Sequence, residues 1–312
     1  MLQLKKILLI STNALGDTYL TCAAFKSIKD FFKKVRIDIV STENAEFFLD
    51  EVGFDNLYLL KKKSFADMHS LVSKIRKTKY DIVFNFFPGQ MNSSVFKLSN
   101  AEEKIGFTNF IKKKSWHNDE DVLKIKSQPK SKNTWKPEDN YLDRISLPLK
   151  SAGIETEVSK HVFNFPYDGT SNYDIVLHLF SSDANRKINI DSVKKIIFQF
   201  CEKEDKKICL IGDEKEISGM KELNGVKNLQ IEINPDIKKL TGLILNAKLF
   251  IGVDSFPIHI ADAYNIKTLG IFYYNNERSV FQNMENKYIF RVTDNSLNVT
   301  ELLKFIKTKK LF

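Results

Sequence analysis

Residues 252–259, in the C-terminal half, bring together side chains that often bind ligands. They read Gly-Val-Asp-Ser-Phe-Pro-Ile-His, and an apolar run ends just before them. The pattern predicts a buried strand that ends here and a short helix that follows. In open α/β sheets a ligand lies beyond the carboxyl ends of the strands, and a helix N-terminus presents N–H groups to an anion. Asp254, Ser255 and His259 are therefore candidate ligand contacts, although a histidine satisfied within the core would show the same pattern.

A carboxylate, Asp17, has the corresponding place in the N-terminal half. It lies between the buried run 6–10 and a helix whose apolar spacing begins at Thr18. A carboxylate in this position can take a proton from a hydroxyl as a general base. It can also do no more than cap the helix. The residue type alone does not separate these two interpretations.

Strands and helices alternate along the chain, which is typical of parallel sheets covered on both faces. Apolar or β-branched runs predict strands at 6–10, 36–40, 56–60, 80–87, 173–180, 207–212, 229–233, 249–251 and 266–272. Helical spacing predicts helices at 18–32, 45–51, 65–77, 92–98, 137–149, 191–200, 213–216, 237–245, 255–265 and 300–310.

The length of 312 residues suits two domains of roughly 150 residues each. Pro, Gly and small polar residues concentrate at 165–172. We therefore predict domains at 1–166 and 173–312, joined by a linker at about 167–172. The basic amphipathic helix at 300–310 can pack back on the N-terminal domain or touch a membrane.

The composition excludes several classes of protein. Hydrophobic residues make up 43% of the chain and charged residues 28%, and no apolar run approaches the roughly 20 residues of a membrane-spanning helix. The basic start at Lys5 and Lys6 is too short for a secretory signal, and three sparse cysteines suit a reducing compartment, so we expect a cytoplasmic protein. The histidines show no metal-ligand spacing, so we expect neither a metal nor another cofactor.

The formal net charge of +9 is unevenly distributed. Residues 111–136 hold eight Lys against three Asp or Glu, a local excess of five. This segment has few apolar residues and no period, which predicts a long loop. Its charge favours an anionic glycolipid, an anionic membrane surface or nucleic acid, whereas a solvated loop would need no partner. No reading helix or stacking sheet accompanies it, so we do not expect nucleic acid.

Two stretches resemble one enzyme family. The pattern Gly252-Val-Asp-Ser-x-Pro-x-His259-Ile-Ala, followed by a hydrophobic strand, resembles the donor-site signature of the heptosyltransferase-like glycosyltransferases of family 9. Residues 6–29, with Gly16-Asp17 where a helix starts, resemble that family's opening strand, loop and helix. The resemblance implies an α/β GT-B architecture, in which two Rossmann-like domains face each other across a cleft.

The resemblance also implies roles for single residues. Asp17 matches the proposed general base, which takes the acceptor hydroxyl's proton while that oxygen attacks the anomeric carbon opposite the departing phosphate. The family has a basic residue at the donor's diphosphate, where Arg186 fits first and Lys187 second, although both can be plain solvated side chains. The family places a Glu on the nucleoside ribose, where Glu216 fits best and Glu214 is the other choice.

The acceptor contacts are less sharply defined. Asn85, Gln90 and Asn92 follow a strand, and we expect only one of them to line an acceptor pocket. The set of expected acceptor contacts is Asn13, Asn85, Gln90, Lys112 and Lys113.

Two places depart from the family pattern. Phe256 stands where the family usually has a Gly that lets the backbone approach the diphosphate, and residues 273–281 replace a Gly-Pro-Thr run. Both leave room for another donor or another surface-glycan acceptor.

Taken together, the resemblance implies an inverting, metal-independent glycosyltransferase. It would move a sugar from a nucleotide-diphosphate donor, ADP-heptose first, to a lipopolysaccharide core or other surface glycan, with peripheral contact at the inner membrane. The alternative is a non-catalytic nucleotide-sugar or anionic-glycan binding protein of the same fold. A Rossmann oxidoreductase is not expected, because residues 11–17 lack the Gly-x-Gly-x-x-Gly turn.

Overall fold

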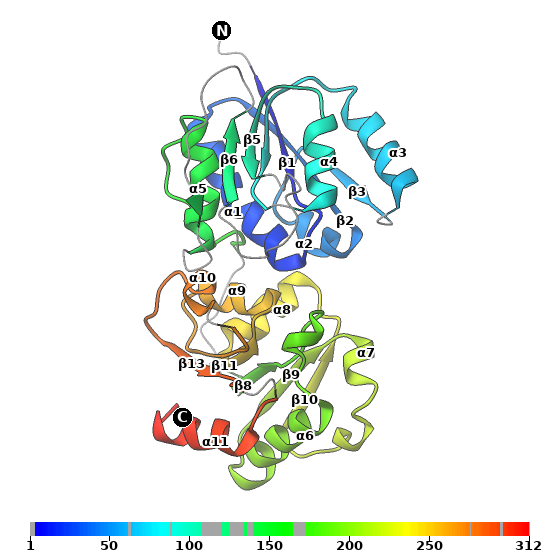
Figure 1. The fold of residues 1–312 in the computed structure, drawn as a ribbon. Helices are drawn as coiled ribbons and strands as arrows, with labels where there is room; N and C mark the ends of the chain where they lie inside the picture. The colour runs from blue at the N-terminus through cyan, green and yellow to red at the C-terminus, as the bar shows by residue number, and fades with distance from the viewer. Residues whose placement is uncertain are drawn as a thin grey trace. The chain divides into compact units, whose positions relative to one another are not determined.

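Runs of Ile, Leu, Val and Phe form the central strands of two separate sheets (Figure 1). A computed structural model divides the chain into two units, Met1–Phe163 and Asn164–Phe312. Most of the predicted linker at 167–172 lies outside the described residues. The structure describes residues 4–61, 64–87, 89–107, 120–124, 134–135, 140–164, 172–274, 276–293 and 296–311.

The N-terminal sheet has the strand order β3-β2-β1-β4-β5-β6-β7. Its strands are β1 (Lys5–Ile10), β2 (Val35–Thr42), β3 (Asn56–Leu60), β4 (Tyr80–Asn85), β5 (Ala101–Phe107), β6 (Glu120–Lys124) and β7 (Thr134–Trp135). The first five run parallel, whereas β6 pairs antiparallel with β5 and with β7. Its helices are α1 (Leu15–Phe31), η1 (Glu43–Ala45), α2 (Glu46–Leu49), α3 (Phe65–Ile75), α4 (Gln90–Leu98) and α5 (Tyr141–Ser151).

The C-terminal sheet is parallel throughout, with the order β10-β9-β8-β11-β12-β13. Its strands are β8 (Tyr173–His178), β9 (Ile208–Gly212), β10 (Leu229–Ile233), β11 (Ala247–Val253), β12 (Thr268–Phe272) and β13 (Lys287–Arg291). Its helices are η2 (Ala184–Arg186), α6 (Ile190–Phe198), the π-helical turn η3 (Gln199–Lys203), α7 (Glu214–Ile217), η4 (Lys221–Leu223), α8 (Ile237–Leu245), α9 (Phe256–Ala263), α10 (Glu277–Val280) and α11 (Val299–Thr308).

Each sheet reverses its strand order once. The reversal lies between β1 and β4 in the N-terminal sheet and between β8 and β11 in the C-terminal sheet. The loops that follow these strands diverge to opposite faces of the sheet, which leaves room for a ligand at the carboxyl edge. Asp17 follows β1, and Asp254 follows β11, so each expected carboxylate lies beside the reversal of its own sheet.

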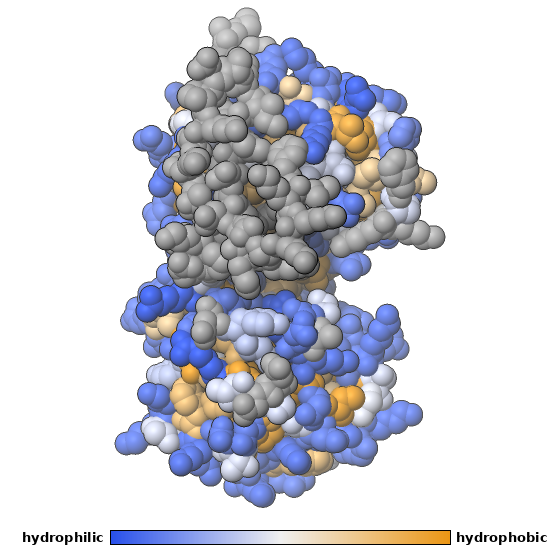
Figure 2. Space-filling view, viewed as in Figure 1, coloured by the Kyte–Doolittle hydropathy of each residue, from blue (hydrophilic) through white to orange (hydrophobic). Residues whose placement is uncertain are grey.

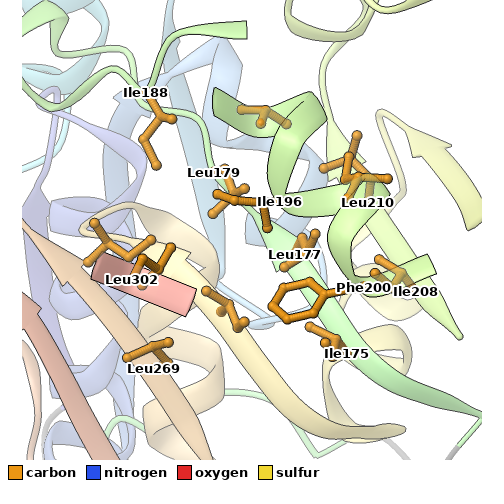
Figure 3. Close-up of a cluster of buried hydrophobic side chains, with 14 of the residues drawn as sticks. Ile175, Leu177, Leu179, Ile188, Ile196, Phe200, Ile208, Leu210, Leu269 and Leu302 are labelled. Atoms are coloured by element: carbon orange, nitrogen blue, oxygen red, sulfur yellow. The ribbon is translucent and has the colours of Figure 1, made fainter. Parts of the chain in front are cut away.

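The C-terminal unit has a continuous apolar core between its sheet and helices. Figure 3 shows Leu177 of β8, Leu269 of β12, Ile196 of α6 and Leu302 of α11 in one buried cluster. The apolar face of α11 therefore packs within its own unit.

Apart from the residues drawn in grey, the face shown in Figure 2 is mostly hydrophilic. Among the described residues, no helix combines the length and the apolar character that crossing a bilayer would require.

Sequence patterns predict most of the strands and helices, and they fail where charged residues hide the apolar pattern. The predictions 56–60, 229–233 and 237–245 match β3, β10 and α8 residue for residue. The loop prediction for 111–136 is wrong in part, because β6 and β7 fall inside it, and the turn prediction for 273–281 is wrong where α10 begins. Strands β5 and β13 were not predicted, because charged residues interrupt or flank their apolar positions.

Gly106 and Gly242 give opposite predictions for stability. Gly106 has φ +155°, and an added Cβ would lie 2.2 Å from the Asn85 carbonyl oxygen, so Gly106→Ala should cost more than about 2 kcal/mol or prevent folding. Gly242 lies in α8 with no atom within 4 Å of an added Cβ, so Gly242→Ala should gain about 0.5–1 kcal/mol. Urea unfolding of both variants tests this, and equal effects of the two would contradict it.

Candidate functional site

Asp17 lies in the first turn of α1, beside the strand-order reversal of the N-terminal sheet. The N-cap of this helix is Ala14, whose side chain makes no capping bond. Asp17 is therefore not the capping residue, and it lies at the positive end of the helix dipole. A charged carboxylate at a sheet's carboxyl edge is what a general base requires.

The loop that leads to Asp17 is fixed by one buried amide, Asn92 of α4. The backbone N–H and the hydroxyl of Thr12 both donate to Asn92 Oδ1, at 2.8 and 2.5 Å. The Asn92 amide nitrogen donates to the Phe87 carbonyl at 2.8 Å and to Asn85 Oδ1 at 3.3 Å, and the Asn85 amide donates to the Phe107 carbonyl at 2.7 Å. This network joins the ends of β1, β4 and β5.

The network changes the assignment of Asn85, an expected acceptor contact, and of Asn92, which was weighed beside it. Asn85 and Asn92 are both fully buried, and their side-chain amides bond within the protein, so we assign them to the support of the loops instead of to acceptor contact. Gln90, at the start of α4, is exposed. Asn13 lies against the same loop, because a Cβ added to Gly89 would come within 2.7 Å of Asn13 Oδ1. Lys112 and Lys113 lie outside the described residues.

Arg144 of α5 is a residue at this edge that the sequence analysis missed. Its buried guanidinium lies 4.9 Å from the ring centres of both Phe87 and Phe107, and its Nε donates to the Phe86 carbonyl at 3.1 Å. Stacking of this kind favours Arg over Lys. The available signal was that Arg144 shares a helical face with Pro148, which is also buried.

At the strand-order reversal of the C-terminal sheet, two expected donor contacts bind each other. The guanidinium Nη1 of Arg186 donates to Asp254 Oδ2 at 2.6 Å and to the Asp254 carbonyl at 2.9 Å. Arg186 Nε donates to Asp183 Oδ2 at 3.2 Å, and Asn276 Nδ2 donates to Asp254 Oδ2 at 2.8 Å. The charge of Arg186 is therefore shared between two carboxylates.

Ser255 and His178 form a second pair at this edge. Ser255 Oγ lies 3.1 Å from His178 Nδ1, and its hydroxyl donates to the Val253 carbonyl at 3.3 Å. Burial lowers the pKa of His178 to about 4, although a backbone hydrogen bond and the charge of Asp213 oppose this. His178 is therefore neutral at pH 7, and it is a functional candidate that the sequence analysis left in a strand.

Glu216 and Lys187 lie near the same edge. Asp213 caps α7, and the Glu216 carboxylate accepts the Asp213 N–H at 2.8 Å in a capping box. Burial raises the pKa of Glu216, and the charge of Lys187 opposes that shift. Lys187 is exposed and makes no ion pair with the described residues. It is therefore the cation at this edge that is best placed to meet an anionic ligand.

The remaining candidates lie in α9. Phe256 is 7% exposed and His259 is 4% exposed, so both side chains pack into the unit. The described residues contain no group of three or more His, Cys, Asp or Glu side chains placed to hold a metal ion.

Comparisons with known proteins agree on one family. The model of glycosyltransferase family 9 (heptosyltransferase) matches residues 68–301. Lipopolysaccharide heptosyltransferase 1 from Campylobacter coli is 29% identical over 91% of this chain and 89% of its own length. Lipopolysaccharide heptosyltransferase 3 from Escherichia coli is 23% identical over 82% of this chain and 80% of its own length.

Solved structures share the fold. A family 9 glycosyltransferase from Veillonella parvula superposes with a TM-score of 0.70 at 13% identity, covering 98% of this chain and 97% of that chain. E. coli heptosyltransferase WaaC with ADP superposes with a TM-score of 0.68 at 15% identity, covering 97% and 99%. The expected architecture of two Rossmann-like domains of the GT-B class is thereby confirmed.

Thr12→Val tests the buried network. The variant removes the hydroxyl bond to Asn92, so it should destabilise the protein by about 1 kcal/mol and speed amide exchange across residues 11–17, as measured by hydrogen exchange with mass spectrometry. Thr241→Val is the matched control, because the buried Thr241 hydroxyl has no hydrogen-bond partner among the described residues. Equal exchange in the two variants would argue against the network.

His178 makes stability depend on pH. The folded pKa of about 4 lies below the ordinary value of 6.5, so on acidification the unfolded chain takes up this proton first. The His178 contribution is present above about pH 6.5 and is lost as the pH falls toward 4. The free energy of unfolding of the wild type should therefore fall by about 1–3 kcal/mol relative to that of His178→Asn between pH 6.5 and pH 4. Thermal unfolding of both proteins measures this difference, and a difference that stays the same at every pH would contradict the assignment.

Proposed function

The chain belongs to glycosyltransferase family 9, and from that premise we propose that it transfers heptose from ADP-heptose to a lipopolysaccharide core or other surface-glycan acceptor. Family membership makes it a glycosyltransferase of lipopolysaccharide biosynthesis. We propose further that the transfer inverts the anomeric carbon and needs no metal. The observation that supports this is the position of Asp17, a carboxylate in the first turn of a helix beside a strand-order reversal.

Asp17 takes the role of general base in this proposal. It accepts the proton of the acceptor hydroxyl while that oxygen attacks the anomeric carbon, and the nucleoside diphosphate leaves from the opposite face. The buried network around Asn92 holds the loop before Asp17 in one conformation. That rigidity preserves the geometry of proton transfer.

The charges of the candidate residues in the C-terminal unit indicate which part of the donor each one contacts. A carboxylate repels phosphate but accepts hydrogen bonds from hydroxyls, so Asp254 suits the donor's sugar. Arg186 is already held by Asp183 and Asp254, so Lys187 is the better cation for the diphosphate. Ser255 and His259 lie at the start of α9, and Glu216 is proposed for the ribose.

The adenosine diphosphate donor is supported by the relatives. Solved E. coli WaaC structures contain ADP and ADP-2-deoxy-2-fluoro heptose. Phe256 does not argue against this donor, because its side chain is buried within the unit and so does not extend into solvent where the family has Gly.

The acceptor is proposed to be an anionic glycolipid or glycan, contacted by Asn13, Gln90 and the lysines of residues 111–136. We place the reaction in the cytoplasm, with peripheral contact at the inner face of the inner membrane. No cofactor is proposed, because the nucleotide sugar is a substrate.

Calorimetric titration with ADP-, GDP-, UDP- and CMP-sugars tests this function. We expect ADP-heptose to bind, Asp254→Ala to weaken it by about tenfold, and Asp17→Asn to leave binding unchanged while lowering transfer by about 10²–10⁴-fold.

Three results would count against the proposal. Binding without transfer by the wild type would favour the non-catalytic binding protein of the same fold. Full transfer activity of Asp17→Asn would show that Asp17 is not the general base. If the protein bound no nucleotide sugar, the proposed transfer from ADP-heptose would be refuted.

A further inference from the structure

The turn after β12 brings an amide to the carboxylate that follows β11. Asn276, the N-cap residue of α10, has no capping bond from its side chain. Its Nδ2 instead donates to Asp254 Oδ2 at 2.8 Å. The Asn276 side chain therefore bonds to a residue of the candidate donor site instead of capping its own helix.

Asp254 is held from two directions. Arg186, from η2, donates to the same Oδ2 at 2.6 Å, and Asn276 approaches from α10. The Asp254 side chain is only 10% exposed. Both bonds use Oδ2, and Oδ1 has no hydrogen bond to the described residues.

Arg186 alone would fix this carboxylate less well. Its guanidinium also binds Asp183, so the two carboxylates compete for one cation. A second donor from another element restricts rotation of the Asp254 carboxylate plane. An amide does this without changing the net charge of the site, which an additional Lys or Arg would do.

We propose that Asn276 is a positioning residue of the donor site, which turns Asp254 Oδ1 toward a hydroxyl of the donor's sugar and so sets which sugar is accepted. This inference rests on the proposed function. Its chemistry is that of a carboxylate reading hydroxyls, since phosphate oxygens offer no proton to Asp254 at neutral pH.

The inference separates the sugar from the nucleotide. If Asn276 acts through Asp254 on sugar hydroxyls, its loss should weaken the nucleotide sugar and leave the free nucleoside diphosphate unaffected. A residue that only stabilised the fold would weaken both ligands alike.

The experiment uses Asn276→Ala, Asn276→Asp and a matched control, Asn283→Asp. Asn283 lies in the same segment, is exposed, and places its amide nitrogen 3.5 Å from Glu285 Oε2, so its substitution also sets a new carboxylate beside an existing one. Affinities for ADP and for ADP-heptose are measured by calorimetry, and kcat and KM are measured with ADP-linked sugars that differ in one hydroxyl. Thermal unfolding shows which variants fold. If Asn276→Asp does not fold, Asn276→Ala alone provides the test.

We expect both Asn276 variants to lower the affinity for ADP-heptose by about tenfold or more and to change the affinity for ADP by less than about threefold. The differences in kcat/KM among the ADP-linked sugars should become smaller. Asn276→Asp should be the worse of the two, because it replaces a donor by a like charge. Asn283→Asp should resemble the wild type in every measurement.

Two outcomes overturn the inference while the proposed function stands. One is that the Asn276 variants match Asn283→Asp; the other is that ADP and ADP-heptose are weakened equally. A wild-type protein that binds no nucleotide sugar would instead overturn the proposed function and this inference with it.

Discussion

A polar group buried at the end of a parallel strand is costly to leave without a hydrogen-bond partner, and this cost shapes both candidate sites. Leaving such a group unpaired costs about 1–3 kcal/mol. Asn92 meets the constraint most completely, because both its oxygen and its nitrogen are bonded while the residue is fully buried. The loops at the carboxyl edge of the N-terminal sheet therefore have little freedom to rearrange.

The two sheets meet the same constraint with different chemistry. The N-terminal edge uses neutral amides and one Thr hydroxyl, which form hydrogen bonds without adding a net charge. The C-terminal edge uses an Arg between two Asp, joined by an Asn. An ion pair in a partly buried place is costly to break by removing one partner. The C-terminal edge is thus the more sensitive of the two to any change in charge.

How far the sequence predicts this structure depends on how local each feature is. Many strands and helices follow from runs of a few residues, and β3, β10 and α8 were found to the residue. Strands such as β5 and β13 carry charges that hide the apolar pattern. The positions of Asp17 and Asp254 could be predicted because each follows a recognisable strand. The pairing of Arg186 with Asp254 could not, since 68 residues separate them and both were expected to meet the donor independently.

Burial, which the sequence does not show, is the reason that we assign Asn85 to the support of the loops instead of to the acceptor. An Asn just past a strand is equally compatible with an exposed loop and with a buried network, and the difference lies in where Phe107 and Asn92 are placed by tertiary packing. His178 was missed for the same reason, because its partner Ser255 lies 77 residues away.

Helix capping differs between the ends of the helices. Several helices away from the strand-order reversals are capped by a side chain: Ser64 caps α3, Asp236 caps α8 and Asn298 caps α11. Of the four α-helices that follow strands at the reversals, α1, α4 and α9 have no such bond, whereas Asn189 caps α6. Ser255 is a residue type well suited to capping, yet its hydroxyl bonds to His178 and Val253 instead. A missing cap costs about 1 kcal/mol, and the N–H groups it leaves at a helix start are the donors that an anionic ligand uses. The uncapped starts of α1, α4 and α9 therefore lose some stability and keep N–H groups that the proposed reaction can use.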